Sequence, residues 1–139
     1  MKTSVEKMVI AMLKDYPRLD QKINDRREEI KRFDWSTDEN VGGGKAQNKP
    51  WTYYDTLIDR WQQDDQINAW QREKAVISDC YNHADEDTQL IIRSVYFGRG
   101  ETIRSLITTD QLYCSLKTAY AKRNRFIEDV ARRLHILFL

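Results

Sequence analysis

Residues 87–134 decide the expected fold: DTQLIIRSVYF (87–97), GRGETIRSLITTDQLYCS (98–115) and LKTAYAKRNRFIEDVARRL (116–134). In the last segment, apolar or small side chains recur at helical spacing and cations occupy the opposite face. The apolar stripe consists of Ala119, Phe126, Ile127, Val130, Ala131 and Leu134. Ser115 stands just before this segment, where its side-chain oxygen can accept from the free N–H groups of a first helical turn. The pattern predicts two short apolar helices followed by a capped, basic amphipathic helix.

Such a helix has what a DNA-reading helix-turn-helix requires. A buried stripe sets the angle of presentation, cations meet phosphates, and amide and phenol groups reach base edges. Within this set we expect the base edges to be read by Lys117, Tyr120, Arg123 and Asn124. The candidate DNA-binding residues are Ser115, Lys117, Thr118, Tyr120, Lys122, Arg123, Asn124 and Arg125.

A basic helix face is also typical of an ordinary solvated surface, so the charge distribution matters. Residues 98–139 hold eight Lys or Arg against four Asp or Glu, a local charge of +4, whereas the whole chain carries only +1. The positive charge is therefore concentrated where the expected reading helix lies. This asymmetry favours double-stranded DNA as a partner.

The composition bounds the remaining possibilities. A chain of 139 residues with 40% hydrophobic and 32% charged residues indicates one helix-rich domain or a small domain with a helical appendage. Cys80, Cys114, His83 and His135 have no metal-ligand spacing, so we expect neither a metal nor a cofactor. Without a convergent nucleophile and base, we expect a binding protein and not an enzyme. No stretch approaches the ~20 apolar residues of a spanning helix or forms a signal peptide, which favours a cytoplasmic location without membrane contact.

We expect an all-α protein: residues 1–84 as an antiparallel, coiled-coil-like helical hairpin and residues 85–139 as the helix-turn-helix domain. The first helix should span residues 4–15, capped by Thr3 or Ser4. A second, over residues 17–33, carries a narrow seam in which Arg26 takes one apolar position. It should face a long helix over residues 53–84, which with its continuation to residue 88 holds nine acids and three bases. This acidic face is either solvated or suited to a protein partner.

Residues 34–52 are expected to be a loop, with consecutive glycines followed by a lysine at positions 42–45. A phosphate-binding P-loop requires a glycine where this chain has Glu39 and a Ser or Thr where it has Ala46. The spacing therefore excludes that motif. Weaker contacts to a DNA backbone remain conceivable for Lys45, Asn48 and Lys49.

The pattern Tyr-Phe, a short Gly/Arg turn, Thr-Ile-x-x-Leu-Ile and Ser-x-x-Thr-x-Tyr-x-x-Arg-Asn-x-Phe-Ile-x-x-Val-Ala (96–131) resembles a known family. It is similar to the helix-turn-helix of phage late-gene transcriptional activators of the RinA/ArpU type, which itself resembles region 4 of sigma factors. The GGGKAQNK loop also looks like one in these Gram-positive prophage regulators. The resemblance covers most of the chain and is tightest over residues 115–131 and 41–49. It implies a sequence-specific activator of packaging and morphogenesis genes in a bacterial host cell.

Several alternatives stay open. In another register, the turn falls at Thr108 and Thr109 and the reading helix starts at Asp110. A small terminase-like DNA-packaging subunit joins similar elements, and an adaptor for RNA polymerase would use the acidic helix. Residues 134–139 hold five apolar side chains in six. We expect the last helix to run to residue 139 and this tail to complete the core or a homodimer contact.

Overall fold

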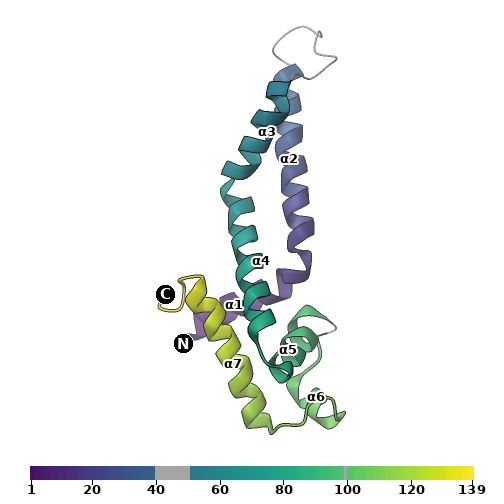
Figure 1. The fold of residues 1–139 in the computed structure, drawn as a ribbon, viewed down its shortest axis with the longest axis vertical. Coiled ribbons are helices and arrows are strands. Elements are labelled where there is room, and N and C mark those ends of the chain that lie inside the picture. The colour runs from purple at the N-terminus through teal and green to yellow at the C-terminus, as the bar shows by residue number, and fades with distance from the viewer. Residues whose placement is uncertain (40–50, 99) are drawn as a thin grey trace. The chain divides into compact units, whose positions relative to one another are not determined.

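The computed structural model describes residues 1–39, 51–98 and 100–139, and within these ranges the chain is helical without any strand. This confirms the expected all-α class. No helix within the same ranges combines the length and apolarity needed to cross a membrane. Lys45, Asn48 and Lys49 lie outside the described residues. The elements are α1 (Thr3–Asp15), the 3-10 turn η1 (Tyr16–Arg18), α2 (Leu19–Glu39), α3 (Trp51–Gln63), α4 (Asp65–His83), α5 (Glu86–Ile92), the π-helical η2 (Arg93–Phe97), α6 (Ile103–Thr108) and α7 (Leu116–Arg133) (Figure 1).

The chain divides into two compact units. The hairpin unit is continuous and comprises residues 18–72, whereas the terminal unit joins residues 1–17 to residues 73–139. The boundary expected between residues 84 and 85 therefore lies inside the terminal unit, between α4 and α5. Residues 1–17 belong to the terminal unit because the apolar side chains of α1 are buried there.

Two helix boundaries in the hairpin unit differ from expectation. The backbone of α2 stays helical to Glu39, through six residues assigned to the loop. The long helix expected over residues 53–84 is broken at Asp64 into α3 and α4. The Asp64 carboxylate accepts a hydrogen bond from the Ile67 N–H at 3.0 Å, so it caps α4. It also accepts from Arg26 at 3.0 and 3.3 Å, which explains why an arginine occupies an apolar position of the α2 seam.

The contacts in the hairpin unit establish an antiparallel pairing. The Trp61 indole donates to the Arg27 carbonyl at 3.2 Å. Further along, the Lys22 ammonium lies 5.9 Å from the Trp70 ring centroid. Later residues of α3 and α4 thus contact earlier residues of α2. The two arms therefore run antiparallel, as expected for a hairpin.

Two apolar clusters form the core of the terminal unit, and α7 contributes to both. In the first, Val5, Val9 and Leu13 of α1 pack with side chains of α4, α5, η2, α7 and the tail: Ile77, Cys80, Ile92, Tyr96, Phe126, Ile127, Val130, Ala131 and Leu137. The second cluster holds Ile91, Ile103, Leu106, Leu112 and Ala119. The first helix therefore stabilises the expected reading helix. Neither Thr3 nor Ser4 caps α1, because Lys2 is its N-cap residue and makes no side-chain cap bond.

The last helix does not run to residue 139, contrary to expectation. Its end is closed by hydrogen bonds from the His135 N–H to the Arg132 carbonyl (3.1 Å) and from the Ile136 N–H to the Ala131 carbonyl (2.9 Å). His135 adopts the left-handed conformation, with φ 60°. Together with the two hydrogen bonds, this conformation forms a Schellman motif, which reverses the chain. The reversal buries Leu137 in the first cluster and leaves Phe138 91% exposed.

Candidate nucleic-acid interface

α6 is a short helix with a defined start and end. The Thr102 side chain accepts from the Ser105 N–H at 3.1 Å and caps the N-terminus. At the other end, the N–H groups of Asp110 and Gln111 donate to the carbonyls of Ile107 and Leu106, and Asp110 takes φ 59°. This second Schellman motif directs the chain away after Thr108. Asp110 thus belongs to the turn and does not begin the next helix.

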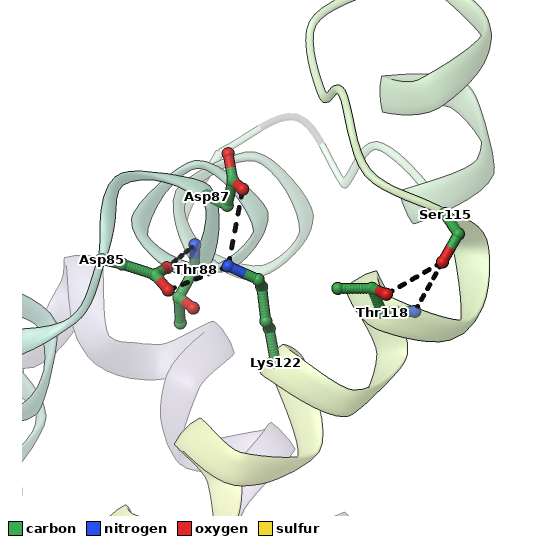
Figure 2. Close-up of polar contacts among 6 residues, drawn as sticks. All are labelled: Asp85, Asp87, Thr88, Ser115, Thr118 and Lys122. Atoms are coloured by element: carbon green, nitrogen blue, oxygen red, sulfur yellow. Dashed lines mark hydrogen bonds and ion pairs between the residues drawn. The ribbon is translucent and has the colours of Figure 1, made fainter.

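The next helix, α7, starts where the Ser-x-x-Thr pattern predicts. Ser115 has an extended backbone, and its Oγ accepts from the Thr118 N–H at 3.1 Å (Figure 2). The same hydroxyl lies 2.9 Å from the Thr118 hydroxyl. The cap predicted at Ser115 is therefore confirmed. Both hydroxyls hold the first turn of α7 together.

One side of α7 is anchored in the two cores and another is exposed. Ala119, Phe126 and Ile127 are buried. Six of the eight predicted DNA-binding residues are exposed, and two of these, Ser115 and Thr118, form the cap. The other four form what we call the α7 face: Lys117, Tyr120, Asn124 and Arg125. Steps of three and four residues place Lys117, Tyr120 and Asn124 along one side of the helix, and Arg125 lies about 100° around from Asn124, at the edge of the face. The face presents two cations, a phenol and an amide.

Lys122 does not belong to this face. Its ammonium group lies 2.9 Å from an Asp85 carboxylate oxygen and 3.5 Å from one of Asp87 (Figure 2). Asp85 is also the N-cap of α5, where it accepts from the Thr88 N–H at 2.7 Å. The hydrogen bonds from Thr88 and Lys122 lower the pKa of Asp85 to about 2. Lys122 therefore ties α7 to the start of α5.

Arg123 is still more enclosed, with only 14% of its side chain exposed. Its Nε donates to the Tyr96 hydroxyl at 2.7 Å, and its Nη2 lies 3.0 Å from Oε1 of Glu6. Nη1 donates to the Asn124 side-chain oxygen at 2.7 Å. The structure therefore brings Arg123 together with α1 and η2, although the sequence pattern placed it with the base-reading residues.

The partners of these two cations were missed for different reasons. An aspartate just before a helix is typical of an N-cap, but nothing local indicates that Asp85 also meets a lysine 37 residues away. Glu6 has no sequence signal at all, because α1 was assigned to the hairpin. No group of three or more His, Cys, Asp or Glu side chains in the described ranges is arranged to hold a metal ion.

The fold and these contacts define an all-α protein whose capped, basic helix contributes to two small cores. Its family is shown by a family model that matches residues 5–132: the chain belongs to DUF722, described as a protein of unknown function. No curated protein matches the chain. No solved structure matches it either.

Proposed function

We propose that this protein is a sequence-specific, double-stranded DNA-binding transcriptional regulator in which α6 and α7 act as a helix-turn-helix. The observation that carries the proposal is the α7 face, where Lys117, Tyr120, Asn124 and Arg125 are exposed on a helix anchored from behind. A recognition helix needs this combination, because its angle must be rigid while its polar side chains stay available to DNA.

The proposed contacts follow from side-chain chemistry. Asn124 suits the paired donor and acceptor of adenine, although its side-chain oxygen also accepts from Arg123. Lys117 suits the acceptors of guanine, and Tyr120 can hydrogen-bond a base edge or a phosphate. Arg125 lies at the edge of the face and suits a phosphate.

Arg123 and Lys122 take a different role in this proposal from the one the sequence suggested. Their cationic groups are engaged with Glu6, Asp85 and Asp87, so they position α7 instead of reading bases. Withdrawing either from its carboxylate to meet DNA would leave that carboxylate without its cation close to phosphates, which opposes binding. Their effect on DNA affinity is therefore indirect.

The biological part of the proposal comes from the resemblance to RinA/ArpU-type activators. It extends DNA binding to the activation of phage late genes in the cytoplasm of a bacterial host. RNA polymerase would be a second partner. The acidic residues of α3 and α4 supply a surface of the charge that suits a basic protein segment.

Selection from a random duplex library, followed by anisotropy titrations on the selected site, tests the DNA-binding proposal. Lys117→Ala and Asn124→Ala should each weaken specific binding by about 1–3 kcal/mol without changing the melting temperature. Arg132→Ala is the matched control, because Arg132 is also an exposed cation of α7 but lies more than two turns beyond Asn124. It pairs with Glu128 and Asp129. If no sequence is enriched over random duplex, the proposal fails.

A further inference from the structure

Tyr113 lies in the loop between α6 and α7 and is 87% exposed. Its two neighbours in the chain are not exposed in this way. Leu112 is buried in the second cluster, and Cys114 and Leu116 pack against that cluster. Tyr113 is therefore displayed outward from a loop whose flanking side chains are anchored.

The backbone of this loop is also held in place. The N–H groups of Gln111 and Leu112 both donate to the Leu106 carbonyl, at 3.0 and 3.1 Å. Two residues after Tyr113, the Ser115 cap starts α7. A side chain between two such anchor points has a defined position before any partner binds, which lowers the entropy cost of using it in a contact.

The segment of the chain that contains Tyr113 has the charge of a phosphate-binding segment. Residues 104–125 hold five cations, Arg104, Lys117, Lys122, Arg123 and Arg125, against the single acid Asp110. Lys122 and Arg123 are engaged inside the fold, whereas Arg104, Lys117 and Arg125 are exposed. A neutral O–H donor beside such cations is suited to an anionic oxygen.

The place of Tyr113 in the chain puts it near a groove edge under the proposed function. Tyr113 lies four residues before Lys117, the first residue of the α7 face. A recognition helix contacts base edges with its N-terminal residues. If the α7 face fills the groove, a side chain from the preceding loop lies at its rim, where the phosphates are.

We infer that the Tyr113 hydroxyl donates a hydrogen bond to a backbone phosphate of the DNA bound by α7, an inference that rests on the proposed function. This contact fixes how far α7 enters the groove and carries no base specificity, because every sequence presents the same phosphate. Tyr113 is thus a positioning contact at the start of the recognition helix.

The test compares full-length Tyr113→Phe with wild type on the selected site and on random duplex, across a salt series. We expect Tyr113→Phe to weaken both about tenfold, since hydrogen bonds to charged groups are the stronger ones. The ratio of specific to random binding stays unchanged, and so does the salt slope, because a phenol releases no counterion. Lys117→Ala, by contrast, should reduce the salt slope by about 1.

Tyr54→Phe is the matched control, because Tyr54 is an exposed tyrosine of α3 in the hairpin unit. It should bind DNA as wild type does, and all variants should melt at the wild-type temperature. If Tyr113→Phe binds with wild-type affinity, or loses affinity only for the selected site, the inference is wrong. DNA binding by wild type would still support the proposed function in that case. If wild type itself does not bind duplex DNA, the proposed function fails first.

Discussion

At the residue scale, Arg123 within α7 and His135 at its end determine how firmly that helix is held. Arg123 is the clearest case, because its guanidinium joins Tyr96 of η2 and Glu6 of α1 in a position that is largely shielded from water. Removing the guanidinium leaves the Glu6 carboxylate and the Tyr96 hydroxyl without their partner in this shielded position.

Arg123→Ala should therefore lower the free energy of unfolding by about 1–3 kcal/mol in urea titrations. Lys117→Ala, on the exposed face of the same helix, should change it by less than about 0.5 kcal/mol. A double-mutant cycle with Glu6→Gln should show coupling, since the two groups are in contact. Equal stability of Arg123→Ala and Lys117→Ala would contradict the positioning role of Arg123.

His135 occupies the left-handed position of the motif that ends α7, with φ 60°, and its side chain is exposed. A residue with a Cβ is strained in this region, whereas glycine is not. We expect His135→Gly to stabilise the protein by about 1 kcal/mol, seen as a higher melting temperature. His135→Ala keeps the Cβ and should give no gain. Identical melting of the two variants would show that the backbone strain is absent.

At the scale of elements, the start of α5 and the middle of α7 are linked through one carboxylate. Asp85 caps α5 and binds Lys122, and these interactions lower its pKa from 3.8 to about 2. Its charged form is favoured in the folded state, so its contribution to stability is complete above about pH 4. The contribution is lost as the pH falls through the interval down to about 2.

The free energy of unfolding should therefore fall more steeply between about pH 4 and pH 2 in wild type than in Asp85→Asn. Asparagine is the matched substitution because it still caps a helix but does not titrate. Lys122→Met should give an intermediate slope, since Thr88 still donates to Asp85. Parallel curves for wild type and Asp85→Asn, measured by urea unfolding at each pH, would refute the linkage.

At the scale of the whole molecule, the terminal unit is assembled from both ends of the sequence. Val5, Val9 and Leu13 are fully buried in the same cluster as Phe126, Ile127 and Val130. α7 thus depends for part of its anchoring on a helix more than a hundred residues earlier. Without that support, α7 would lose its defined angle.

A fragment of residues 85–139 lacks the buried side chains of α1 and α4, so it should melt without a cooperative transition in circular dichroism. In the full chain, Leu13→Ala should cost about 2–5 kcal/mol, because it opens a cavity in the first cluster. Met8→Ala, at a half-exposed position of α1, is the control and should cost far less. A fragment that melts as cooperatively as the full chain would show that α1 is dispensable.

The sequence by itself determined those features whose causes are local. Helical spacing predicted the buried stripe of α7, and the Ser-x-x-Thr pattern predicted its cap, because both depend on residues within one or two turns. The paired helices of the hairpin follow from equally short-range signals. The exposed positions of the α7 face are the complement of the same periodicity.

Only the tertiary structure decided which distant groups meet. Arg123 looks like any exposed cation of a basic face until Glu6 and Tyr96 are seen beside it. Asp64 looks like part of an acidic surface until Arg26 is seen across the hairpin. Similarly, α1 has the same apolar stripe whether it packs on α2 or on α7. Periodicity states which face of a helix is buried but not what covers it, because the covering side chain comes from a part of the chain that is remote in sequence.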